Sequence, residues 1–288
     1  MKKILFATTA LVATASVAAA DVSFSGYGRF GVAYSGATSS TDITSRLRLV
    51  ITATAEADSG VEFGGMVRFQ QNEGNFAYGN AARFYARSGG LELGVGHIWG
   101  ALESMPGQYP VDMGLTGLGY QYVAYAGNGD AYTSGQGTLG TSGSNGVEVM
   151  YSAGDFKAHI SASDINDRIA AYGAYTFSGW TVALGVQDSS AAGDTEGTAS
   201  VGGTIGPVDL GLAYADNGTN GDRIVLSGRF EVGAATNVEA YYTDDSLAGD
   251  SYGIDFNHDL GGGTSLRGGV VRNFAGDTNA DFGVRFNF

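Results

Sequence analysis

Hydrophobic and polar residues alternate along most of this chain. Near its end Phe282, Val284, Phe286 and Phe288 would lie on one face of a strand, and the residues between them on the other. The same period of two recurs along the sequence, which predicts strands over 22–34, 43–56, 61–70, 82–87, 91–97, 147–151, 156–162, 169–177, 180–186, 197–205, 208–214, 224–232, 238–242, 252–256, 266–270 and 280–288.

The connections between these strands alternate between short and long. Tight turns rich in glycine, such as 58–60, 88–90 and 178–179, are followed by longer polar segments. This rhythm is typical of a transmembrane β-barrel, which has short periplasmic turns, longer outer loops and strands with one apolar face. We therefore predict an all-β fold, a 16-stranded antiparallel transmembrane β-barrel, wide enough to hold an aqueous channel.

Residues 99–145 interrupt this pattern. They contain one short candidate strand at 120–126, but counting it would give an odd number of strands, and bacterial single-chain barrels have an even number. The whole stretch is therefore interpreted as one insertion after the fifth strand. Insertions of this length are usually functional or disordered.

The N-terminus has the pattern of a secretory signal peptide. A basic start at Lys2 and Lys3 precedes an apolar stretch and the small residues Ala18 to Ala20. We expect residues 1–20 to be removed before Asp21, which leaves 21–288 as a single barrel domain, an exported protein.

Composition narrows the classes of function. Without Lys2 and Lys3 the net charge changes from −14 to −16, which disfavours nucleic acid as a partner. The absence of cysteine excludes disulfides and thiolate chemistry. No apolar run after the predicted signal peptide reaches about 18 residues, so no membrane helix is expected.

Arginines are concentrated on the polar faces of the first four predicted strands. They are Arg29, Arg46, Arg48, Arg68 and Arg83. Because neighbouring strands lie about 4.8 Å apart, these side chains should form one basic patch in the lumen. Glu103 and Asp112 of the insertion are positioned to face it, and the field between them would influence which ions and solutes pass. The alternative is that all seven are ordinary solvated residues of the lumen.

Four segments carry a family resemblance: Gly26-Tyr27-Gly28-Arg29-Phe30-Gly31, Ser45-Arg46-Leu47-Arg48, Gly60-Val61-Glu62-Phe63-Gly64, and the ending Phe282 to Phe288. They resemble the general diffusion porins of purple non-sulfur, Rhodobacter-like alphaproteobacteria. The resemblance implies a homotrimer in the outer membrane of a Gram-negative bacterium, surrounded by outer-membrane lipid. It further implies passive passage of small hydrophilic solutes and ions, with no cofactor.

In such proteins the third loop folds into the lumen and narrows it, and acidic loop residues face basic residues on the wall. Insertion 99–145 occupies that position but contains few acids, so a weaker field and a lean towards anions are expected. The last strand resembles that of other outer-membrane barrels, in which a terminal phenylalanine, here Phe288, is an assembly signal.

Three other functions remain open at this stage. They are a solute-specific channel, a barrel enzyme with His159 as its base, and a secreted soluble β-protein. No catalytic residue or metal site is predicted, because the three histidines lie on separate strands without ligand spacing. Loose calcium binding by acidic loops such as Asp244-Asp245 is left open.

Overall fold

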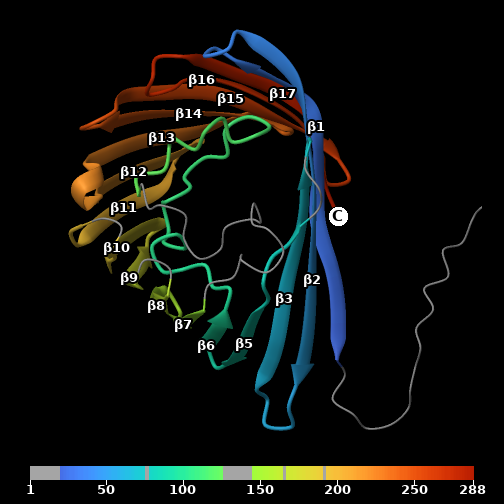
Figure 1. Cartoon of the computed structure of the whole chain (residues 1–288), viewed down its shortest axis with the longest axis vertical. Helices are drawn as coiled ribbons and strands as arrows, with labels where there is room; N and C mark the ends of the chain where they lie inside the picture. Colours follow the sequence, from blue (N-terminus) through green and yellow to red (C-terminus); the bar gives the residue numbers. More distant parts are fainter. Residues whose placement is uncertain (1–19, 75–77, 126–144, 165–166, 191–192) are drawn as a thin grey trace, which may run out of the picture.

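The computed structural model describes residues 20–74, 78–125, 145–164, 167–190 and 193–288. Figure 1 shows one curved antiparallel sheet that closes on itself around a lumen. Its strands are β1 (Asp21–Ser35), β2 (Ser40–Glu56), β3 (Glu62–Asn72), β4 (Tyr78–Gly79), β5 (Arg83–Ser88), β6 (Leu91–Gly96), β7 (Gly146–Ala153), β8 (Phe156–Ser163), β9 (Arg168–Phe177), β10 (Trp180–Asp188), β11 (Glu196–Ile205), β12 (Val208–Asp216), β13 (Asp222–Gly233), β14 (Thr236–Asp245), β15 (Gly249–Gly261), β16 (Thr264–Arg272) and β17 (Thr278–Asn287).

The barrel has sixteen strands although its strand segments are numbered from β1 to β17. Both β4 and β5 pair with β3, so they are two pieces of one barrel strand, interrupted at residues 80–82. The prediction of a 16-stranded antiparallel barrel is therefore confirmed. The interruption was not foreseen, because residues 78–79 carry too short a pattern to indicate a strand.

The barrel closes where β1 meets β17. Their register runs from Tyr27 opposite Asn287 to Tyr34 opposite Ala280. Gly26 extends this ladder, since its N–H donates to the carbonyl oxygen of Phe288 at 2.9 Å and its own carbonyl accepts the N–H of Phe288 at 3.1 Å. Closure leaves the sheet without a free edge, as a membrane barrel requires.

The two faces of the wall follow the predicted alternation. The large hydrophobic side chains of β1 and β17 point outward, among them Phe24, Phe30 and Phe282. Arg29 and Asp281, of opposite parity, are buried on the inner side. In the described residues no helix is long and apolar enough to cross a membrane.

The chain between β6 and β7 enters the lumen. Its described part, 97–125, forms turns and irregular structure without any strand, and Figure 1 shows it inside the barrel, on the side of β9–β16. We call residues 97–125 the inner loop. The rest of the predicted insertion, 126–144, lies outside the described residues, as does the predicted signal peptide except for Ala20.

Candidate functional site

The inner loop is packed against the wall by two hydrophobic clusters. One joins Val111, Met113, Leu118, Tyr122, Val123 and Ala124 of the loop to Ala213, Ala215, Val225, Tyr241 and Val271 of the wall. The other joins Ala101, Leu102, Met105 and Tyr125 to Ala170, Ala174 and Ala183, with Tyr172 packed beside them. Both clusters lie on β9–β16. Apolar burial therefore holds the described loop to one side of the lumen.

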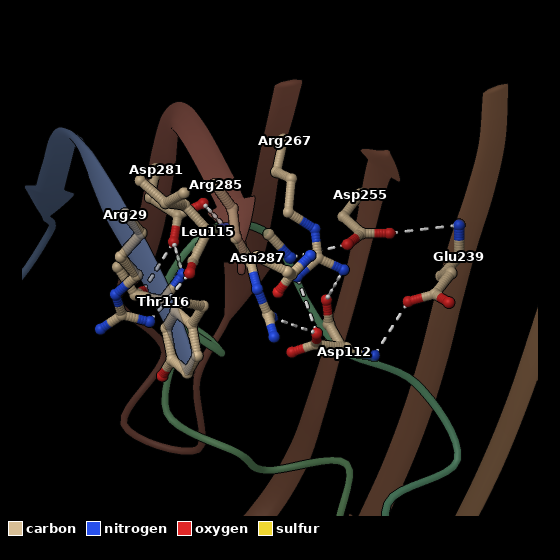
Figure 2. Close-up of polar contacts among 12 residues, drawn as sticks. Arg29, Asp112, Leu115, Thr116, Glu239, Asp255, Arg267, Asp281, Arg285 and Asn287 are labelled. Carbon is tan, nitrogen blue, oxygen red and sulfur yellow. Dashed lines mark hydrogen bonds and ion pairs between the residues drawn. The ribbon is translucent and has the colours of Figure 1, made fainter. Parts of the chain in front are cut away.

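Three wall carboxylates also hold the backbone of this loop (Figure 2). Asp281 on β17 accepts the N–H of Leu115 at 2.9 Å and both the N–H and the hydroxyl of Thr116, at 2.7 and 2.6 Å. On neighbouring strands Asp255 accepts the N–H of Gly114 at 2.6 Å, and Glu239 accepts the N–H of Asp112 at 2.9 Å. Together these five hydrogen bonds anchor loop residues 112–116 to the wall.

Asp112 is the loop carboxylate that faces wall arginines. Its Oδ2 lies 2.7 Å from Nη1 of Arg267 and 3.0 Å from Nη1 of Arg285 (Figure 2). The Asp112 side chain is 52% exposed, so it remains in contact with the aqueous lumen. The loop thus places one negative charge against a basic part of the wall.

Arginines from β1, β2 and β17 surround the side chain of Tyr27. The guanidinium carbons of Arg285 and Arg48 lie 4.3 and 5.1 Å from the centre of the Tyr27 ring. Nη1 of Arg46 donates to the Tyr27 hydroxyl at 3.1 Å. Arg29 completes the group, and its Nη1 donates to the carbonyl of Leu115 in the loop at 2.8 Å. We call Arg29, Arg46, Arg48 and Arg285 the arginine group.

The strand register forces three of these like charges together. Arg29 is directly opposite Arg46 across β1 and β2, and directly opposite Arg285 across β1 and β17. Like charges opposite one another destabilise a sheet. Neutral side chains of β3 bind the two arginines of β2. Asn72 accepts a hydrogen bond from Nε of Arg46 and Gln70 accepts one from Nε of Arg48, both at 2.7 Å.

The other two predicted arginines have partners other than Tyr27. Arg68 packs on Trp99, with its guanidinium carbon 5.9 Å from the ring centre. Arg83 is buried between Glu92 and Glu148, at 2.6 Å from each. The five predicted arginines therefore differ in their partners: Arg29, Arg46 and Arg48 belong to the arginine group, whereas Arg68 and Arg83 contact other side chains. Arg83 pairs with carboxylates that β6 and β7 supply and that the sequence did not single out.

Glu148 also contacts His159, the histidine that would be the base if the barrel were an enzyme. Nε2 of His159 lies 3.0 Å from Oε2 of Glu148, and both side chains are almost completely buried. The ring of Tyr172 contacts His159 edge-on, with ring centres 5.6 Å apart. Together with the Arg83–Glu148 pair, this contact joins β5, β7 and β8 through a buried polar network.

The remaining predicted residues lie in distinct places. Glu103 accepts a hydrogen bond from the hydroxyl of Tyr109 within the loop. Phe288 is half exposed and continues the outer face of the final strand. Of the acids considered for calcium, Asp245 is already paired with Arg223 at 2.7 Å and accepts the N–H groups of Leu247 and Ala248.

The site contains residues that the sequence did not single out. The alternating pattern assigns Tyr27, Arg267 and Arg285 to the lumen face but gives them no particular role. The role of the wall carboxylates could not be predicted, because it depends on the path of the loop. Burial of Tyr122 in that loop, with a smaller contribution from neighbouring groups such as Asp112, raises the pKa of its phenol far above the usual value. Tyr122 is therefore a neutral packing residue.

Comparison with known proteins places this barrel among described relatives. A family profile described as Gram-negative porin matches residues 7–278. The porin of Fuscovulum blasticum is 34% identical and that of Rhodobacter capsulatus 29% identical, each over 93% of this chain and all of the relative. A solved mutant of Rh. blastica porin superposes with a TM-score of 0.83 at 29% identity, over 93% of this chain and 100% of that one.

Proposed function

The chain belongs to the Gram-negative porin family and forms an outer-membrane diffusion channel, and we propose that its selectivity is set where the inner loop faces the arginine group. The observation that carries this proposal is the bridge from Asp112 on the loop to Arg267 and Arg285 on the wall. A solute that passes between loop and wall meets fixed charges of both signs within a short distance. Such a field favours small polar solutes and disfavours apolar ones.

We further propose that transport is passive and general, without turnover. The loop is held by hydrophobic packing and by three carboxylates, so it serves as a fixed restriction. His159 supports no catalytic proposal, because its side chain is buried against Glu148 and has no exposure to the lumen. Exclusion by size then acts together with the charges that line the gap.

Ion preference should lean towards anions. The arginine group and Arg267 contribute five positive charges, and Asp112 is a half-exposed carboxylate beside them. Asp281, Asp255 and Glu239 are directed at loop N–H groups, which already neutralise part of their field. The mobile ions of the lumen are therefore expected to be enriched in anions near β1 and β2.

Three properties of the assembled protein belong to the same proposal. We propose export by a cleaved signal peptide, recognition of the last strand with Phe288 as an assembly signal, and a homotrimer in the outer membrane. Their support is family membership together with the N-terminal and C-terminal sequence patterns.

Single-channel recording of detergent-purified protein in a planar bilayer tests the proposal. Stepwise conductances in groups of three, nearly proportional to salt, are expected for an open trimeric channel. In a salt gradient the reversal potential should have the sign of anion preference. No conductance would contradict the proposed function, and a conductance abolished by one solute at low concentration would favour a solute-specific channel.

A further inference from the structure

A polar cavity of about 420 Å³ lies on the outer side of the inner loop. It is open to the lumen and is lined by the ends of β1, β2 and β17 remote from the short turns, by loop residues 116–119, and by Glu73 in the turn after β3. Its polar lining includes Arg29, Asp42, Thr44, Glu73, Thr116 and Asn279. Volumes of this size are typical of sites for small molecules.

The cavity has charges of opposite sign at separate places. Arg29 lies on β1 at the level of the loop and is anchored by its bond to the carbonyl of Leu115. Glu73 lies in the turn after β3, where Oε2 accepts the N–H of Ser45 at 2.8 Å and Oε1 accepts the hydroxyl of Thr44 at 3.2 Å. Asp42, further out on β2, is exposed.

The carboxylate of Glu73 is charged at neutral pH. Burial raises its pKa, but the hydrogen bonds from the backbone and from Thr44, together with the charge of Arg29, outweigh burial and hold the pKa below its usual value. A carboxylate has about four acceptor positions, and the two bonds to β2 leave acceptor capacity on Glu73. Arg29 likewise has donors beyond the one used by Leu115.

From this arrangement we propose that the cavity is a binding subsite for zwitterionic α-amino acids on their way to the constriction. Arg29 would bind the carboxylate of the solute, and Glu73 and Asp42 would bind its ammonium group. Thr116 and Asn279 add polar groups between them. The inference rests on the proposed channel function and adds a solute class to it.

Other small ligands fit this lining less well. A simple anion would meet two carboxylates for one guanidinium, and a metal cation would meet Arg29. Among the described residues no group of three or more His, Asp or Glu side chains could hold a metal ion. A solute with both charges satisfies both parts of the cavity at once, because each charge meets its complement.

The subsite is tested by the effect of L-alanine on the potassium chloride current of purified channels in a planar bilayer. A zwitterion carries no net current, so a fall in conductance reports occupancy. We expect a saturable fall when L-alanine is added on the side of the long loops. N-acetyl-alanine and alanine amide, each of which lacks one charge, should need roughly fivefold higher concentrations, as loss of an exposed charge pair implies.

Variants E73Q and D42N should each raise the half-maximal alanine concentration by roughly fivefold. The control D244N removes an exposed acid at the corresponding end of β14, outside the cavity, and should leave that concentration unchanged. A channel that conducts but shows no saturable response to L-alanine, or a response equal in all three variants, overturns the subsite alone. A protein that does not conduct overturns the channel proposal instead.

Discussion

The guanidinium of Arg285 lies over the ring of Tyr27, 4.3 Å from its centre, and so joins the last strand of the barrel to the first. Tyr27 also contacts Arg48 with its ring and Arg46 with its hydroxyl. A single phenol therefore fixes the spacing of three positive charges. This makes Tyr27 a positioning residue for the field in the lumen.

Replacing Tyr27 should weaken anion preference in a graded way. Y27A removes the ring under Arg48 and Arg285, each contact being worth about 0.5–1 kcal/mol, so both side chains become mobile. Y27F retains the ring and loses only the bond from Arg46. We expect the reversal potential in a salt gradient to change in Y27A by more than twice the change in Y27F. Equal shifts would assign the effect to the hydroxyl.

Neutralising Asp112 should increase anion preference. D112N removes the negative charge that faces Arg267 and Arg285 and keeps the shape of the side chain. A unit charge at 4 Å in water is worth about 1 kcal/mol, so the anion-to-cation permeability ratio should rise by up to roughly fivefold. The matched control is E103Q, an equal change of charge at a carboxylate bonded to Tyr109. An equal shift in E103Q would show that only total loop charge matters.

Loss of Asp281 should loosen the inner loop. D281A removes the acceptor of three hydrogen bonds from Leu115 and Thr116, each worth about 1.5–3 kcal/mol when the acceptor is charged. Current noise in the open state should increase, and closure should occur at lower voltage. T116A loses only the hydroxyl bond and should give an intermediate result. Unaltered noise in D281A would mean that hydrophobic packing and the bonds to Asp255 and Glu239 hold the loop without Asp281.

The buried network at Arg83 should contribute strongly to barrel stability. R83M leaves Glu148 with one partner fewer in a buried site, which should lower the free energy of unfolding by about 3–5 kcal/mol. R87M is the control, because the pair of Arg87 with Glu62 is 51% and 29% exposed and should contribute less than about 1 kcal/mol. Urea titration of protein refolded in lipid vesicles measures both. Similar losses in the two variants would contradict a special role for the network.

Local alternation was sufficient to predict the barrel wall. The parity that sets Phe282 and Val284 apart from Arg285 is a property of neighbouring residues, and a charge on the lipid face would cost about 2–4 kcal/mol at mid-bilayer. The strand count followed from the same period and the requirement for an even number. The break between β4 and β5 was not predicted, because it depends on how residues 80–82 lie beside β3.

The site could be predicted only as far as single strands determine it. Arg29, Arg46 and Arg48 lie on β1 and β2, which are consecutive in the sequence, so their proximity could be predicted from strand order. Arg285 joins them through closure of the barrel, whereas Arg83 pairs with carboxylates on β6 and β7. Which carboxylates would meet the loop backbone depends on the path of an irregular segment, for which no periodic signal exists. The roles of these residues in permeation remain predictions.

The arginine group lies across the seam between β1 and β17. Residues of these two strands are separated by almost the whole sequence, so their pairing is the least local contact in the fold and should form late. The final step of folding therefore brings Arg285 against Arg29 and must overcome their repulsion. An intermediate in which β1 and β17 are not yet paired would contain most of the wall but no complete arginine group. This porin therefore acquires its discrimination between solutes only when the barrel closes.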